Sequence, residues 1–301
     1  MEPMAERPVD GGGFGRHANA SSIGCEMAGL MGRMTGWRDE PARDHYVRTG
    51  FDRYDRRSGG LRMGTLTAIA GGPSMGSDVL ALDVARHAAL GFGRPTAYSC
   101  SSLSRDEVIM RIMSAETGVA PRLLMDGDLD GDEWDRCEVF ASFCGDAPLY
   151  IDADRDMDVG RFMDSCRGLA ESAGLKLAVL DAPDRVARNR DVMDSDLRRL
   201  AGLAKDLGIA VVATIPMDRN RFPLERFRDR GRIPRPVLAD VRYADTVCQH
   251  SNTVLVVRRT EFDGMDGGPE KALLTVAKHQ WCTSEEYALE YDPQFPRFVE
   301  P

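Results

Sequence analysis

The sequence predicts an α/β fold with a mostly parallel, twisted sheet that carries helices on both faces. Short apolar runs of β-forming residues alternate with helical stretches along most of the 301-residue chain, which is typical of parallel strands joined by crossover helices. A glycine-containing turn separates the first of these runs from the helical stretch that follows it. Apolar residues make up 43% of the chain and charged residues 29%, a composition typical of a globular domain with a sizeable core.

The N-terminal part of the chain differs in character from the rest. Residues 1–20 are rich in glycine and polar residues, so we expect a disordered tail. Apolar residues recur at helical spacing over 22–34 and predict a short helix that needs a surface to pack on. Residues 39–58 are predicted to form a charged connector. The expected organisation is therefore a tail over 1–20, a linker-type helix and connector over 21–47, and one large domain over 48–301.

Seven strands are predicted in the large domain. They are the runs Leu66–Ala70, Thr96–Ser99, Leu149–Asp152, Leu177–Asp181, Ile209–Thr214, Thr253–Val257 and Leu273–Ala277. Helical stretches near 77–90, 104–116, 158–173 and 194–207 separate the first five runs. The last runs lack a long helix between them, which favours an antiparallel extension at one edge of the sheet.

Composition also narrows the possible functions. The formal net charge of −9 argues against binding of nucleic acid by the whole surface, although a local basic patch remains compatible with it. The chain has neither an apolar run long enough to cross a bilayer nor the start of a secretory signal. Seven cysteines without a CxxC pair indicate reduced thiols in a cytoplasmic protein. The five histidines form no HxxxH or HxH set, and the acidic stretch 126–131 lacks the last ligand of a calcium loop, so no metal site is expected.

The turn after the first strand has the spacing of a phosphate-binding loop. It comprises Gly71, Gly72, Pro73, Ser74, Met75, Gly76, Ser77 and Asp78. In the Walker pattern G-x-x-x-x-G-K-[ST], the lysine contacts the phosphates and the hydroxyl ligates Mg²⁺. Here Ser77 replaces the lysine and Asp78 replaces the hydroxyl residue. A carboxylate at ~4 Å from a phosphate charge costs about 4 kcal/mol at an effective dielectric constant near 20.

The same segment also fits a different class of enzyme. Gly72 to Gly76 spells G-x-S-x-G, the nucleophile elbow of α/β-hydrolases. Asp181 or Asp240, followed by His250 or His279, would give the chain order of a catalytic triad. Against this reading, the sequence has no oxyanion segment of the HGGG type, and Pro73 is awkward inside an elbow.

Several motifs in order resemble the motor domain of DnaB-type replicative helicases over residues 48–300. The similar segments are Thr49–Asp52 with Ser58–Leu61, Gly72–Gly76, Val108–Met113, Gly127 to Trp134, Leu177–Asp181, and Arg235–Val237 with Asp240–Arg242. The resemblance implies a RecA-like P-loop NTPase core that binds ATP and Mg²⁺, assembles into rings and encircles single-stranded DNA. It also likens the 22–34 helix to the linker helix that packs on a neighbouring subunit.

The resemblance assigns roles to further positions, and most of them have lost the required side chain. The family's catalytic glutamate falls at Ser101, its sensor glutamine at Pro216, and the arginine of its trans-acting pair at Gln280. The Walker B aspartate is retained as Asp181, and the trans-acting lysine as Lys278. The resemblance therefore implies a degenerate ATPase, for which no cofactor is expected unless the loop still binds ATP and Mg²⁺.

An arginine-rich stretch supplies the candidate DNA contacts. Between 219 and 235, seven arginines stand against two acidic residues, a local charge of +5. Its members Arg219, Arg221, Arg228, Arg230 and Arg232, together with Arg242, are the candidates for phosphate contacts. A solubilising surface loop, or salt bridges between subunits, would explain the same composition.

Two functions remain open from the sequence. The first is a non-hydrolysing DnaB-like protein that binds single-stranded DNA weakly and regulates, or belongs to, a replication complex. Its expected partners are further copies of itself and a replicative helicase or other replisome protein, with no membrane contact. The second is a divergent but active ATP-dependent DNA helicase.

Overall fold

The computed structural model describes residues 22–39, 45–182, 189–221, 235–259 and 270–301. The chain divides into two units, residues 1–43 and residues 44–301. In the first unit, helix α1 (Ile23–Asp39) extends the helix predicted over 22–34. Its apolar side chains Ile23, Met27, Leu30, Met31 and Met34 are all exposed.

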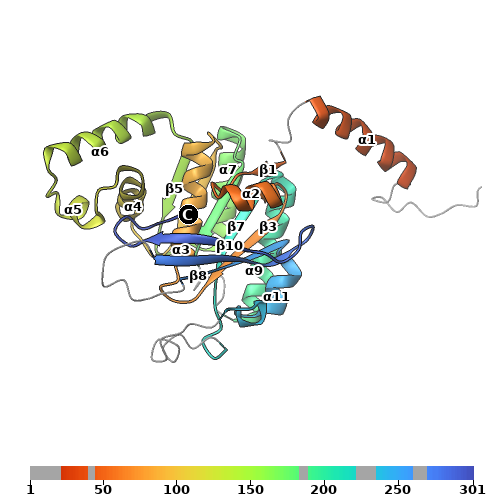
Figure 1. The fold of residues 1–301 in the computed structure, drawn as a ribbon. Coiled ribbons are helices and arrows are strands. Elements are labelled where there is room, and N and C mark those ends of the chain that lie inside the picture. The colour runs from red at the N-terminus through yellow and green to blue at the C-terminus, as the bar shows by residue number, and fades with distance from the viewer. Residues whose placement is uncertain (1–21, 40–44, 183–188, 222–234, 260–269) are drawn as a thin grey trace, which may run out of the picture. The chain divides into compact units, whose positions relative to one another are not determined.

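The second unit is built on a nine-stranded sheet (Figure 1) with the order β11-β10-β9-β8-β3-β7-β6-β4-β5. Six neighbouring strands, from β8 to β5, are parallel, whereas β9, β10 and β11 extend the sheet in antiparallel fashion. The strands are β3 (Leu66–Gly71), β4 (Thr96–Cys100), β5 (Leu149–Ala153), β6 (Leu177–Asp181), β7 (Ala210–Pro216), β8 (Thr253–Arg259), β9 (Glu270–His279), β10 (Glu286–Asp292) and β11 (Arg297–Val299). The predicted α/β sheet and its antiparallel extension are confirmed.

Helices cover both faces of this sheet and create two apolar cores. On one face, α3 (Ser77–Arg86), continued by a π-helical turn (His87–Gly91), packs with α4 (Arg105–Thr117). On the other face lie α7 (Val159–Ala173) and α9 (Arg190–Leu207). The parallel strands are buried on both sides, which explains why they read as continuous apolar runs.

Shorter elements complete the unit. They are the small ribbon β1 (Tyr46–Val47) and β2 (Leu61–Arg62), the helices α2 (Asp52–Ser58), α5 (Pro121–Asp126), α6 (Gly131–Phe143) and α11 (Ala244–His250), and the 3₁₀ turns Cys144–Asp146 and Leu238–Asp240. Among the described residues, no helix combines the length and apolarity that a membrane crossing requires.

The predicted charged connector over 39–58 is wrong for its C-terminal part. Residues 46–47 pair in the ribbon, and α2 buries Tyr54 and Asp55. The Asp55 carboxylate accepts hydrogen bonds from the backbone and hydroxyl of Thr49 at 2.8–3.1 Å. A buried carboxylate of this kind is satisfied locally, so a charged sequence need not be a solvated linker.

Candidate functional site

The C-terminal ends of the parallel strands gather most of the candidate residues at one edge of the sheet. Gly71, at the end of β3, pairs in register with Pro216 at the end of β7. Cys100, at the end of β4, is the partner of Asp181 at the end of β6, and Ser101 follows it directly. Ligands of open α/β sheets bind outside this edge, so the structure places these sequence-predicted residues where a site is expected.

The glycine loop connects β3 to the start of α3 in a left-handed turn. Ser74 has a φ of 61° and Gly76 a φ of 86°. The Met75 amide donates to the Gly72 carbonyl at 3.0 Å. Pro73 and Ser74 are exposed, whereas Met75 is buried in the core under α7 and α9. The loop is thus fixed by one buried side chain at its centre.

Neighbouring side chains leave little room for a Cβ atom at two glycines of the loop, Gly71 and Gly76. A Cβ on Gly76 would lie 2.8 Å from Cζ of Phe298 on β11, and its positive φ already favours glycine. A Cβ on Gly71 would lie 3.0 Å from Cβ of Ser77. The C-terminal strand therefore packs directly on the loop, a contact that the sequence pattern does not reveal.

An arginine from β8 covers the loop. Arg259 donates from Nη1 to the Ser74 carbonyl at 3.1 Å, and its backbone amide lies 3.4 Å from Sδ of Met75. Its guanidinium pairs bidentately with Glu270 at 2.6 Å and lies 4.2 Å from the ring centroid of Tyr291. Sequence reasoning missed this arginine, and the end of an apolar strand offers no signal that would have identified it.

The acidic residue of the loop has its own cationic partner. Nη1 of Arg111, on α4, lies 2.9 Å from Oδ2 of Asp78, in the first turn of α3. Both side chains are partly exposed, at 30% and 44%. Arg111 lies in a segment with recognised family resemblance, but sequence reasoning assigned it no role at the site.

Asp181 is buried at the floor of the same edge. Its carboxylate accepts hydrogen bonds from Thr214 at 2.8 Å and from Tyr98 at 3.1 Å. Burial raises the pKa of Asp181 to about 6, and the negative charge of Asp78 contributes in the same direction. The hydrogen bond from Thr214 opposes this rise in the pKa. An aspartate in this setting takes up a proton at mildly acidic pH.

Lys278 and Gln280 lie at the opposite edge from the loop, because β9 runs antiparallel to β8. The Lys278 ammonium donates to the carbonyls of Cys248 and Ser251 at 2.5 and 2.6 Å, at the C-terminal end of α11. The Gln280 side-chain oxygen accepts a hydrogen bond from Asn252 at 2.7 Å. Among the described residues of this chain, neither Lys278 nor Gln280 joins the group around Asp181.

Three of the candidate DNA-contacting arginines are described. Arg219 and Arg221 follow β7 and are exposed. Arg221 donates to the Ala239 carbonyl at 3.3 Å, and the Arg242 amide donates to the Pro216 carbonyl at 3.1 Å. Two segments far apart in the sequence therefore meet beyond β7. The candidates Arg228, Arg230 and Arg232 lie outside the described residues.

The hydrolase interpretation finds little support. Ser74 has the positive φ typical of a nucleophile elbow, but the triad candidate Asp181 accepts hydrogen bonds from Thr214 and Tyr98 rather than from a histidine. The two candidate histidines are engaged elsewhere, His250 with Asp194 and His279 with the amides of Trp281 and Cys282.

Over the part of the chain that the structure describes, no group of three or more histidine, cysteine or acidic residues is arranged to hold a metal ion.

Comparison with solved structures supports the assignment of the fold. A solved structure described as an ATPase domain superimposes with a TM-score of 0.78 at 17% identity, covering 94% of this chain and 100% of that chain. A DnaB-like replicative helicase, solved in a study of its interactions with primase, gives a TM-score of 0.76 at 17% identity over 94% of this chain and 68% of that one. The fold and the loop at its C-terminal edge define a RecA-like α/β core of the P-loop NTPase class.

The family follows from sequence comparison. The family model described as the DnaB-like helicase C terminal domain matches residues 46–300, and the chain belongs to this family. The replicative DNA helicase DnaB of Leifsonia xyli subsp. xyli is 30% identical over 263 residues, which cover 84% of this chain and 56% of that protein. DnaB of Geobacillus stearothermophilus is 24% identical over 261 residues, again 84% and 56%. The chain thus spans about half the length of the curated relatives that it matches.

Proposed function

We propose that this chain is a DnaB-family protein that does not hydrolyse ATP and acts as a DNA-binding or replisome-binding regulatory component. The observation that carries the proposal is the glycine loop, whose lysine position holds Ser77 and whose hydroxyl position holds Asp78. Family membership supports a role in DNA replication, and the side chains around the loop argue against catalysis.

The residues present do not fit a magnesium triphosphate. Ser77 brings no charge to the phosphates, and Asp78, paired with Arg111, stands in place of the hydroxyl that would ligate Mg²⁺. Among the described residues, two cations near the loop are already engaged, Arg111 with Asp78 and Arg259 with Glu270. Each guanidinium retains further N–H donors, but its positive charge is already balanced by the carboxylate that it contacts. We therefore expect weak or absent binding of ATP.

Hydrolysis lacks further groups even if nucleotide binds. No carboxylate occurs between Ser99 and Ser104, so the strand end after β4 supplies no general base for water. Pro216 has no side-chain donor, and Gln280 is neutral where the family pattern has an arginine. An arginine finger alone is worth about 10³–10⁵ in rate. Retention of Asp181 does not compensate for these losses.

The binding part of the proposal rests on charge and exposure. The exposed Arg219 and Arg221 and the adjacent Arg242 offer guanidinium groups beyond the C-terminal end of β7. The stretch that continues from them carries Arg228, Arg230 and Arg232. Such groups suit weak, sequence-independent contacts with the phosphates of single-stranded DNA.

Self-association is the second element of the proposal. The exposed apolar side chains on α1 need a surface to cover them, and a further copy of this chain would supply it through a ring-type interface. Lys278, at the edge opposite the loop, would then lie near a neighbouring subunit. A replicative helicase or another replisome protein is the proposed heterologous partner.

A divergent, active helicase is the alternative that family membership favours. Measurement of phosphate release with and without single-stranded DNA separates the two. The proposal expects turnover no faster than background under both conditions. Turnover stimulated by DNA would reject it and establish the helicase alternative.

A further inference from the structure

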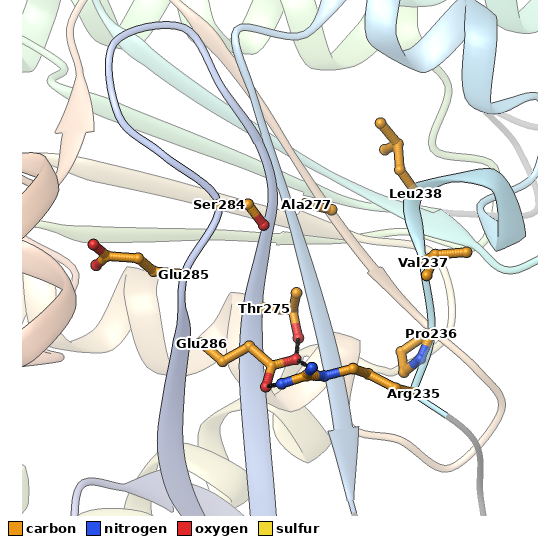
Figure 2. Close-up of a pocket in the computed structure, with 9 residues that line it drawn as sticks. All are labelled: Arg235, Pro236, Val237, Leu238, Thr275, Ala277, Ser284, Glu285 and Glu286. Atoms are coloured by element: carbon orange, nitrogen blue, oxygen red, sulfur yellow. Dashed lines mark hydrogen bonds and ion pairs between the residues drawn. The ribbon is translucent and has the colours of Figure 1, made fainter.

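A pocket with a volume of about 440 Å³ (Figure 2) has no residue of the glycine loop in its lining. It is formed between the segment 235–238, which leads into the turn Leu238–Asp240, and the strands β9 and β10. Its lining residues are Arg235, Pro236, Val237, Leu238, Thr275, Ala277, Ser284, Glu285 and Glu286. Segments far apart in the sequence thus enclose a space that neither forms alone.

One end of the pocket holds an arginine seated on a carboxylate. Arg235 reaches across from its segment to β10 (Figure 2), where its Nε lies 2.5 Å from Oε1 of Glu286 and its Nη2 contacts Oε2. Thr275 on β9 donates a further hydrogen bond to Glu286 at 3.0 Å. The Glu286 side chain is only 20% exposed, whereas that of Arg235 is 66% exposed. The Glu286 carboxylate is therefore part of the pocket wall, and Arg235 contacts it from the solvent-exposed side.

The remaining walls are apolar or small. Pro236, Val237 and Leu238 line one side, and Val237 is 54% exposed. Ala277 and Ser284 leave room opposite them. Glu285 points away from this space (Figure 2) and pairs with Arg57 at 3.0 Å. Glu286 is consequently the carboxylate that faces the pocket.

We propose that this pocket binds an arginine side chain of a partner protein, and that Arg235 occupies the same carboxylate while the partner is absent. A planar guanidinium matches both oxygens of Glu286, as Arg235 demonstrates, whereas a lysine ammonium would use one. The apolar wall then receives a neighbouring apolar side chain of the partner segment. Nucleic acid is disfavoured as the occupant, because its phosphates would meet the negative charge of Glu286.

Replacement of Arg235 by the partner's arginine on Glu286 requires little free energy. Exposed ion pairs contribute about 0.2–1 kcal/mol, since water and salt screen them. An incoming arginine that also buries apolar surface against Val237 gains a term that Arg235 lacks. This inference goes beyond the proposed function and does not depend on whether the chain hydrolyses ATP.

The test uses the peptide Ala-Leu-Arg-Leu-Ala-amide with fluorescein on its N-terminal amine, titrated with the full chain and followed by fluorescence anisotropy. Arg235→Ala removes the internal competitor, so the peptide should bind about two- to fivefold more tightly than to the native protein. Glu286→Gln should weaken binding about two- to fivefold in the Arg235→Ala background. Glu285→Gln is the matched control and should leave the affinity unchanged, because its side chain faces away.

A second peptide, with citrulline in place of arginine, separates charge from shape. It should bind about two- to fivefold less well to Arg235→Ala, because citrulline keeps the shape of arginine but brings no charge to Glu286. Equal binding of both peptides would overturn the proposal. The proposal would also be overturned if Arg235→Ala left the affinity for the arginine peptide unchanged. The same holds if Glu285→Gln and Glu286→Gln lowered that affinity equally. The citrulline comparison requires no substitution at Glu286, so it remains decisive if that variant misfolds.

Discussion

The guanidinium of Arg111 lies 2.9 Å from the carboxylate of Asp78, linking α4 to the first turn of α3. Asp78 stands where the Walker pattern has the hydroxyl that ligates Mg²⁺. A positive charge from the neighbouring helix thus balances the acidic residue within the chain itself. The pair is partly exposed, so its own contribution to stability is at most about 1 kcal/mol.

Restoring charge to the loop should restore binding without catalysis. The double variant Ser77→Lys, Asp78→Thr returns a phosphate-binding ammonium and a metal-ligating hydroxyl to a turn that already has Gly71 and Gly76 at Walker spacing. Calorimetry should detect MgATP binding by this variant and not by the native protein. Phosphate release should stay at background, because Ser101, Pro216 and Gln280 are unchanged. A control with Ser77→Met and Asp78→Thr has the length of lysine without its charge and should not bind. Absence of binding by the lysine variant would mean that this loop no longer accepts phosphate.

Single-stranded DNA should bind weakly and with a strong dependence on salt. Changing Arg228, Arg230 and Arg232 to alanine should weaken binding alike for all sequences. It should also reduce the slope of log affinity against log salt by about 2, since each phosphate contact contributes about 0.7 on single strands. The measurement is fluorescence anisotropy across a salt series. Alanine at three arginines with exposed ion pairs elsewhere, Arg56, Arg122 and Arg167, is the control. Equal losses in the two triple variants would assign the effect to net charge alone.

Removal of residues 1–45 should weaken self-association. The deletion takes away the exposed apolar side chains of α1, whose burial in an interface would contribute about 25 cal/mol per Å². Light scattering at tens of micromolar should show assemblies for the full chain and smaller species for the deletion. The point variant Leu30→Asp should act in the same direction, whereas Glu26→Gln should not. A native protein that is monomeric at this concentration contradicts the ring-type interface.

Stability should respond to pH through Asp181. Burial raises the pKa of Asp181 to about 6 from its ordinary value of 3.8, so the folded state holds this proton more tightly than the unfolded state. The free energy of unfolding therefore falls as pH rises between about 4 and 6, by a term on the order of 3 kcal/mol. Asp181→Asn should flatten this decline in urea unfolding compared at pH 4.5 and pH 7.5. The exposed substitution Asp132→Asn serves as control. If the free energy of unfolding fell as steeply with pH in Asp181→Asn as in the native protein, groups other than Asp181 would be responsible.

The contact between Gly76 and Phe298 should make alanine at position 76 unusually costly. Gly76→Ala adds a methyl group 2.8 Å from the Phe298 ring at a φ of 86°. Gly127→Ala meets nothing within 4 Å at a φ of 69°, so it measures backbone strain alone. Unfolding in urea should show Gly76→Ala to be less stable than Gly127→Ala by about 1–3 kcal/mol, the cost of overpacking. Phe298→Leu should recover part of this difference in the Gly76→Ala background. Equal losses of stability in Gly76→Ala and Gly127→Ala would show that β11 shifts to accommodate the added methyl group without measurable cost.

The sequence by itself predicted seven of the nine strands of the sheet and the place of the loop, but not β10 and β11. Strands such as Leu177–Asp181 are buried on both faces, so their apolar runs are visible without any knowledge of neighbours. The glycine spacing of Gly71 and Gly76 and the replacements at Ser77 and Asp78 are local properties of one segment. The family motifs added the role of Asp181, because it ends a short stretch with a recognisable pattern.

Tertiary structure decided which charges meet. The partners of Asp78 and of the loop backbone, Arg111 and Arg259, come from α4 and β8, which are distant in sequence. The packing of Phe298 on Gly76, and the seating of Arg235 on Glu286, arise in the same way. Periodicity reports which face of an element is buried, but it does not report what that face touches. A charged or aromatic side chain at the end of an apolar strand therefore acquires its role only once the sheet brings its neighbours beside it.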